Sequence, residues 1–290
     1  MKDSSPAASL AHQIVVADGA SPQRFILFLH GVFGMGTNFR AVARAIVSRE
    51  PSWGVVLVDL RGHGATPALA PPHDLGAAAG DLERLCERLA SEGRPVRGVI
   101  GHSFGGKVAL ALVARRPLDL LVLLDSQPGP RDEAPENDSA TSVLAILESL
   151  DRPWSAREDF SAALRERGLS QAIVDWLTMN VRKAGEDYRL RLDLAAIRAM
   201  LEDYFAADLF WVLEDPSRAG VMGVVIGGRS TVLGARSKER LWALAGEGSA
   251  LRIVELPAAG HWVHVDDPQG VVDFAVELLR SPIFTGGSRG

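Results

Sequence analysis

The sequence predicts an α/β fold, in which a mostly parallel central sheet is flanked by helices. Short, almost continuously apolar runs recur in the first half of the chain, segments with helical periodicity separate them, and the same alternation returns near the C-terminus. Strands of a parallel sheet are buried on both faces, which is why such runs are apolar throughout rather than alternating. With 290 residues, 47% of them apolar, the chain can bury a core of this kind.

Six apolar runs are predicted to be strands, at residues 24–30, 54–59, 96–100, 118–125, 221–226 and 251–256. Helical spacing is found at residues 38–48, 81–90 and 107–115. A last helix is predicted from about Pro268 to Arg280, with Asp267 as its N-cap and the proline at the first helical position. Strand and helix therefore alternate, as in a sheet that is covered on both sides.

The strand pattern is interrupted after Asp125. The next residues are rich in Pro, Asp, Glu and Gly, and amphipathic stretches rich in Arg and Glu follow, which indicates an inserted helical cap. The two ends of the chain have the composition of flexible segments. We expect a core of residues 11–125 and 219–282, a cap of residues 126–218, and flexible ends at 1–10 and 283–290.

Charge and cysteine content bear on partners and location. A net charge of −5 without a basic cluster argues against nucleic-acid binding. The single cysteine, Cys86, cannot form an internal disulfide, and the N-terminus lacks the pattern of a signal peptide, so we expect a cytoplasmic protein. The apolar runs are far shorter than the roughly 20 residues of a membrane span. We expect a monomer or small homo-oligomer that acts on a small molecule.

The segment Gly101-His102-Ser103-Phe104-Gly105 lies where a predicted strand meets a predicted helix. Small residues on either side of a serine allow the backbone to turn sharply, so that the hydroxyl projects at the edge of the sheet. The alternative interpretation is a glycine-rich turn with an incidental serine. The setting between strand and helix favours Ser103 as a nucleophile.

The same residues nearly form a phosphate-binding loop. Gly101-x4-Gly106-Lys107 fits that motif, but Val108 stands where a Ser or Thr would hold Mg²⁺. Nucleotide binding is therefore disfavoured.

A serine needs a base to take its proton, and His261 follows the last predicted strand in a loop of small residues. His264 lies three positions further on, which raises the alternative of a metal-binding histidine pair. No carboxylate or cysteine stands at ligand spacing from the pair, so we expect no metal and no cofactor.

The acid is harder to assign. The turn at residues 227–234, after the strand that commonly supplies it, has no carboxylate. Asp125 ends the neighbouring strand and should emerge at the same edge of the sheet, which makes it the predicted acid. Its alternative role is that of a loop-capping aspartate. Ser230 is a further candidate, because its hydroxyl could hydrogen-bond the histidine in place of an acid.

An oxyanion hole needs two backbone N–H groups. We predict those of Phe104, directly after the nucleophile, and of Val32, in the glycine-containing loop after an early strand. Phe33, His102 and Trp262 flank these groups and are predicted to contact the substrate. Seven residues of the insertion are candidates to line an acyl pocket, although such residues are more often core: Trp154, Trp176, Met179, Tyr204, Phe205, Phe210 and Trp211.

Four motifs occur in a characteristic order: His30-Gly31, Asp59-x-Arg61-Gly62-His63-Gly64, Gly101-His102-Ser103-Phe104-Gly105-Gly106 and Gly260-His261-Trp262. In this order they resemble the α/β-hydrolase superfamily over nearly the whole chain. The second motif is interpreted as a structural turn. Gly227-Gly228-x-Ser230, together with residues 259–264, is similar to the small acyl esterases that include bacterial YbfF and mitochondrial abhydrolase proteins.

This resemblance implies a triad of Ser103, Asp125 and His261, with Ser230 assisting, and a helical cap over the site. The predicted function is that of a serine hydrolase that cleaves esters or thioesters of small acyl groups through an acyl-enzyme. The same fold carries acyltransferases, cofactor-free peroxidases, lyases and non-catalytic receptors, which remain alternatives.

Overall fold

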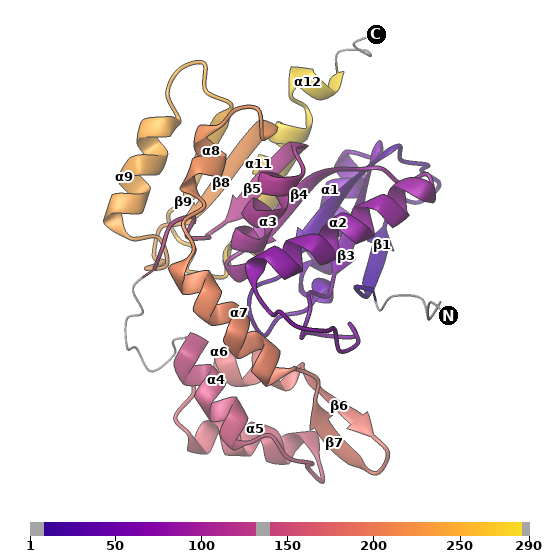
Figure 1. Ribbon diagram of the computed structural model, residues 1–290, viewed down its shortest axis with the longest axis vertical. Helices are drawn as coiled ribbons and strands as arrows, with labels where there is room; N and C mark the ends of the chain where they lie inside the picture. Colours follow the sequence, from indigo (N-terminus) through magenta and orange to yellow (C-terminus); the bar gives the residue numbers. More distant parts are fainter. Residues whose placement is uncertain (1–8, 132–139, 286–290) are drawn as a thin grey trace.

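A seven-stranded sheet forms the centre of the molecule in the computed structural model, which describes residues 9–131 and 140–285 (Figure 1). Its strand order is β1-β3-β2-β4-β5-β8-β9, and only β1 (His12–Val15) runs antiparallel to its neighbour. The other strands are β2 (Arg24–Leu29), β3 (Trp53–Val58), β4 (Val96–His102), β5 (Leu118–Leu124), β8 (Ala219–Gly227) and β9 (Leu251–Leu256). The six predicted strands are thus confirmed, and β1 adds an antiparallel edge.

Helices cover both faces of the sheet, and each face has its own apolar core. The helices α1 (Arg40–Arg49) and α11 (Pro268–Leu279) share one core, whereas α2 (Leu75–Ser91) and α3 (Phe104–Arg115) share the other. Short helices complete the main body: η1 (Gly36–Phe39), α9 (Ala235–Leu244), α10 (Val263–Asp266) and α12 (Pro282–Thr285). The predicted cap of α11 is confirmed, because the Asp267 side chain accepts from the Gly270 N–H at 2.8 Å.

The segment between β5 and β8 folds into helices and one hairpin, and Figure 1 shows α4 to α7 and the hairpin grouped below the main body, whereas α8 lies beside it. Its elements are α4 (Ala140–Ser149), α5 (Arg157–Glu166), α6 (Gln171–Thr178), β6 (Val181–Ala184), β7 (Asp187–Leu190), α7 (Leu194–Ala206) and α8 (Phe210–Glu214). The hairpin β6–β7 is an addition to the helical insertion that the sequence predicts. Gly185, at φ 68°, supplies the left-handed residue of its turn.

Lys107 of α3 joins this segment to the main body. Its buried ammonium donates to three carbonyl oxygens, those of Gly129 at 2.7 Å, Tyr204 at 2.6 Å and Ala207 at 3.1 Å. The ammonium also lies 4.5 Å from the centre of the Tyr204 ring. Burial lowers the pKa of Lys107 to about 8. One cation thus holds the end of α7 and the loop after β5 against the helix that follows Ser103.

The structure describes only residues 9–10 and 283–285 of the ends that are predicted to be flexible, 1–10 and 283–290. Residues 1–8 and 286–290 lie outside the described part of the chain. Leu10, however, is buried in the core, and Phe284 packs edge-on against Trp53 with the ring centres 5.1 Å apart. Apolar contacts therefore hold residues adjacent to both ends.

Candidate active site

Ser103 lies at the sharp turn between β4 and α3, with φ 51° and ψ −119°. An L-residue rarely adopts this left-handed conformation, and it persists only where the surroundings enforce it. A Cβ at Gly101 would collide with the Gly105 carbonyl, and a Cβ at Gly105 would collide with the carbonyl oxygen of His30. The two glycines are therefore required for the turn that presents the Ser103 hydroxyl at the edge of the sheet.

The Ser103 Oγ atom lies 3.0 Å from Nε2 of His261, and Nδ1 of the same ring lies 2.7 Å from Oδ2 of Asp125. Because Nδ1 faces a carboxylate, it carries the ring proton, which leaves Nε2 free to accept from the serine. Asp125 is fully buried, whereas the histidine side chain is 34% exposed. Ser103 and Asp125 directly follow β4 and β5, His261 lies in the loop after β9, and the structure brings these three predicted residues together.

Asp125 is held by four contacts. Its φ is 45°, which turns the chain sharply at the end of β5. Its Oδ1 accepts from the Gly227 N–H at 3.0 Å, and its Oδ2 accepts from the Ser230 hydroxyl as well as from the histidine. Its own N–H donates to the Val225 carbonyl at 2.8 Å. Ser230 therefore contacts the Asp125 carboxylate. The alternative, in which the Ser230 hydroxyl takes the place of an acid beside His261, does not match the structure, because Asp125 occupies that place.

The backbone N–H groups of Val32 and Phe104 are the two open donors beside Ser103. Within residues 9–131 and 140–285, neither group donates to another atom of the chain. Phe104 is the first residue of α3, where N–H groups have no partner inside the helix. The N–H of Phe33, by contrast, donates to Nε2 of His63 at 3.1 Å. The N–H groups of Phe33 and Gly34 are thus engaged within the loop 30–34, whereas that of Val32, the predicted oxyanion donor, is open.

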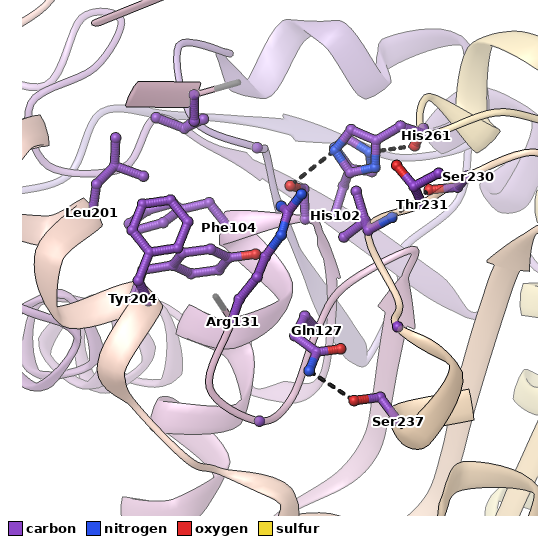
Figure 2. A pocket seen from close by; sticks show the side chains of 18 of the residues that line it. His102, Phe104, Gln127, Arg131, Leu201, Tyr204, Ser230, Thr231, Ser237 and His261 are labelled. Carbon is purple, nitrogen blue, oxygen red and sulfur yellow. Dashed lines mark hydrogen bonds between the residues drawn. The ribbon is translucent and has the colours of Figure 1, made fainter. Parts of the chain in front are cut away.

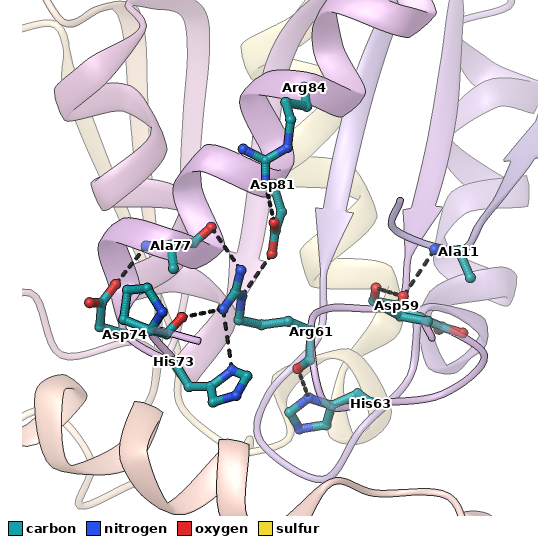
Figure 3. Close-up of polar contacts among 11 residues, drawn as sticks. Ala11, Asp59, Arg61, His63, His73, Asp74, Ala77, Asp81 and Arg84 are labelled. Carbon is teal, nitrogen blue, oxygen red and sulfur yellow. Dashed lines mark hydrogen bonds and ion pairs between the residues drawn. The ribbon is translucent and has the colours of Figure 1, made fainter. Parts of the chain in front are cut away.

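The turn after β3 supports this loop (Figure 3). His63, which accepts from the Phe33 N–H, donates through Nδ1 to the Arg61 carbonyl at 2.8 Å. The guanidinium of Arg61 donates to Asp81 at 2.7 Å, and both side chains are only 4% exposed. Asp59 accepts from the Gly36 N–H at 2.8 Å. These contacts are those of the structural turn that the sequence predicts.

Three buried histidines surround the site, and all are held neutral. Burial lowers the pKa of His30 to about 4 and of His63 to about 3, and it places the pKa of His102 well below 6.5. In His30, Nε2 accepts from the Leu60 N–H at 3.0 Å. A proton on Nε2 would face this N–H group and break the hydrogen bond, which disfavours the charged ring. His102 donates to the His261 carbonyl at 2.9 Å, and their ring centres are 4.8 Å apart. His102 thus positions the loop of the candidate base.

His264 packs its ring against Phe39, 4.3 Å between centres, and against His102, 4.8 Å. Burial lowers its pKa to about 4. No cluster of three potential metal ligands occurs in the described part of the chain, so nothing there completes a metal site around this ring.

A cavity of about 1130 Å³ opens above Ser103, between the edge of the sheet and the segment 126–218 (Figure 2). The predicted substrate-contacting residues Phe33, His102 and Trp262 all line it. Of the seven candidates in the insertion, Trp176, Tyr204, Phe205 and Phe210 line it as well. Trp154, Met179 and Trp211 do not, and Trp154 packs in the core against Phe160 instead.

Two polar residues of the cavity wall, Gln127 and Arg131, were not singled out by any pattern in the sequence. The signal that could have found them is their position. They follow Asp125 within six residues, and a loop that leaves a strand at this edge of the sheet runs past the site.

A model of the alpha/beta hydrolase family matches residues 26–274. The chain belongs to this family. Among its relatives, the chain is 30% identical over 278 residues to the sn-1-specific diacylglycerol lipase ABHD11 of Mus musculus, covering 93% of this chain and 85% of the lipase. It is 26% identical to the esterase YbfF of Escherichia coli K12, covering 85% of this chain and 89% of that enzyme.

The alpha/beta hydrolase fold is also seen in a solved structure of a marine microorganism esterase. That structure superposes with a TM-score of 0.78 at 23% identity, over 94% of this chain and all of the esterase. In the part of the chain that the structure describes, no helix is both long and apolar enough to cross a bilayer. Relatives named lipase or esterase support a hydrolase.

Proposed function

We propose that this protein is a serine carboxylic ester hydrolase that cleaves esters or thioesters of small acyl groups through an acyl-enzyme. The proposal rests on one observation: the Ser103 hydroxyl, the His261 ring and the Asp125 carboxylate form a continuous chain of hydrogen bonds, at 3.0 Å and 2.7 Å. This arrangement activates a serine without a cofactor, because a neutral imidazole takes the proton and a carboxylate stabilises the cation that results.

In this mechanism, Ser103 Oγ attacks the acyl carbonyl and His261 Nε2 takes the hydroxyl proton. The carbonyl oxygen becomes an oxyanion that accepts hydrogen bonds from the Val32 and Phe104 N–H groups. His261 then gives its proton to the leaving alcohol or thiol, and the acyl group stays on Ser103. A water molecule, deprotonated by His261, attacks the acyl-enzyme and releases the acid.

Asp125 keeps the imidazole in the tautomer that this sequence needs. In the proposal, Ser230 assists by donating to the same carboxylate, which fixes its orientation. The segment 126–218 acts as a cap, and it is supported in this role by the residues that it contributes to the cavity wall, among them Val143, Ile173 and Trp176.

The test is labelling by a fluorophosphonate, together with hydrolysis of p-nitrophenyl butyrate, in the wild-type protein, S103A and the matched surface variant S91A. We expect labelling and turnover in the wild type and in S91A, and neither in S103A. Labelling that persists in folded S103A would refute the assignment of the nucleophile. A folded wild-type protein that cleaves none of a panel of short p-nitrophenyl esters and acyl thioesters would favour a non-catalytic role.

A further inference from the structure

Two buried side chains in the cavity present polar atoms that have no partner in the described part of the chain. Tyr204 is only 3% exposed, and its buried hydroxyl forms no hydrogen bond with the described residues. The side-chain oxygen of Gln127, 6% exposed, also lacks a donor. The amide nitrogen of Gln127 is already engaged, because it donates to Ser237 at 2.7 Å and to the Pro130 carbonyl at 3.1 Å. Unpaired buried polar atoms are costly and often face a ligand.

A cation stands beside these atoms. Arg131 lines the same cavity, and its guanidinium has no carboxylate partner among the described residues. Figure 2 shows its side chain next to the Tyr204 ring, with His261 across the cavity. Burial raises the pKa of Tyr204, while Arg131 and Ser103 lie close enough to lower it in part. The tyrosine hydroxyl therefore lies close to both the guanidinium and the candidate nucleophile.

The wall of the cavity is more basic than the protein as a whole. Its arginines are Arg131, Arg229, Arg236 and Arg240, and its carboxylates are Asp208 and Asp266. Arg240 is paired with Glu214, Asp208 accepts from the Phe210 N–H, and Asp266 accepts from the Gly260 N–H at 2.7 Å. With Arg240 paired, three arginines remain beside two carboxylates, and in a chain with a net charge of −5 this local excess of positive charge favours an anionic ligand.

We propose that Arg131 and Tyr204 form a carboxylate-binding subsite, so that the preferred substrate is an ester or thioester that carries a free carboxylate a short chain away from the bond that is cleaved. A guanidinium presents parallel N–H groups that match a carboxylate, and the tyrosine hydroxyl adds a third donor. The short distance follows from the position of Tyr204 next to Ser103. This inference rests on the proposed function, since it specifies the substrate of the same site.

The test compares kcat/KM for the mono-p-nitrophenyl ester of succinate with that for p-nitrophenyl butyrate, which has a similar length and no charge. We expect the wild-type protein to prefer the succinate ester by about tenfold or more, as charge-assisted hydrogen bonds of this kind would provide. In R131Q the preference should be lost, and in Y204F it should be reduced. The surface variant R44Q, which changes the same charge far from the cavity, should keep the wild-type ratio.

A second pair of substrates shows whether the subsite binds a carboxylate on the acyl group or on the leaving group of the ester. O-acetylglycolate carries it on the leaving group, and ethyl acetate is its neutral counterpart. A preference for either carboxylate ester that depends on Arg131 supports the subsite and identifies the side. Equal kcat/KM for charged and neutral esters in both pairs, or a ratio that R131Q leaves unchanged, overturns it.

Binding to S103A separates this inference from the proposed function. Calorimetry should show monomethyl succinate binding about tenfold more tightly than dimethyl succinate, and R131Q in the same background should remove the difference. This readout needs no turnover. If the wild type cleaves no ester but S103A discriminates between the two ligands, the hydrolase mechanism fails while the subsite stands. If the wild type cleaves esters but S103A prefers neither ligand, the subsite fails while the hydrolase mechanism stands.

Discussion

The carboxylate of Asp125 lies 2.7 Å from Nδ1 of His261, although the two residues are 136 positions apart in the chain. It reaches the ring from the end of β5, while the end of the next strand, β8, contributes the Ser230 hydroxyl to the same carboxylate. The Gly227 N–H donates to its other oxygen. The candidate acid is therefore held by groups at and after the end of β8, and substitution can separate the role of Asp125 from that of Ser230.

Asp125→Asn should lower kcat for p-nitrophenyl butyrate by roughly 10³–10⁴-fold, because an amide cannot hold the imidazole in the required tautomer or stabilise its cation. Ser230→Ala should cost about tenfold or less, since Asp125 keeps its contacts with the histidine and with Gly227. Steady-state kinetics on folded proteins checks both values. Full turnover in Asp125→Asn would contradict the triad.

Gly105→Ala should destabilise the protein by about 2–4 kcal/mol, because the added methyl group would meet the carbonyl oxygens of His30 and Leu29, which cannot move without disturbing β2. Urea unfolding measures the change. Gly246→Ala is the matched control, since its Cβ would meet no atom within 4 Å and should leave stability nearly unaltered. An equal effect at both sites would refute the tight packing at the serine turn.

Lys107→Met should reduce the free energy of unfolding by roughly 3–5 kcal/mol, because it removes a cation that serves three buried carbonyl oxygens and leaves them unpaired. Limited proteolysis should also cut the segment 126–218 more readily in this variant. Lys183→Met, at an exposed position of β6, is the control and should behave as the wild type. Wild-type stability in Lys107→Met would contradict the anchoring role.

Stability should fall as the pH drops from about 6.5 towards 4. His30, His63 and His264 have pKa values of about 4, 3 and 4 in the folded protein, below the ordinary value of 6.5. In this window the unfolded chain binds more protons, so the contribution is fully present above pH 6.5 and is lost on acidification. Each such histidine adds about 1.4 kcal/mol per pH unit to the slope.

His63→Gln tests this directly. The glutamine oxygen can accept from the Phe33 N–H in place of Nε2, but it takes up no proton in this range. The slope of the unfolding free energy between pH 6 and pH 4 should therefore decrease by about 1.4 kcal/mol per pH unit. Identical slopes in the variant and the wild type would show that His63 does not titrate as proposed.

The parallel strands could be predicted from the sequence because burial on both faces leaves an unbroken apolar run, as in Trp53–Val58 and at residues 120–124. The edge strand His12–Val15 could not, because it is four residues long and its burial is only partial. The hairpin β6–β7 is short and only partly buried, and its charged residues carry no period that marks it as a strand.

The candidate triad could be predicted because Ser103 and Asp125 stand directly after strands and His261 lies in the loop after the last strand, so the topology brings the three to one edge of the sheet. The polar wall of the cavity could not. Tyr204 lies in an amphipathic helix, where its ring has the same pattern as any core residue. Whether its hydroxyl finds a partner depends on how α7 docks on Phe104 and Arg131, and that is decided by packing in three dimensions.

The segment 126–218 leaves the end of β5 and returns at the start of β8, and these two strands are neighbours in the sheet. Its two attachment points therefore belong to adjacent strands, so it can be lengthened, shortened or exchanged without a change in any strand order or in the serine turn. A chimaera that carries a different segment between Ser126 and Ala219 would keep Ser103, His261 and Asp125, the candidate nucleophile, base and acid. We expect the substrate specificity of such a chimaera to follow the segment that it carries.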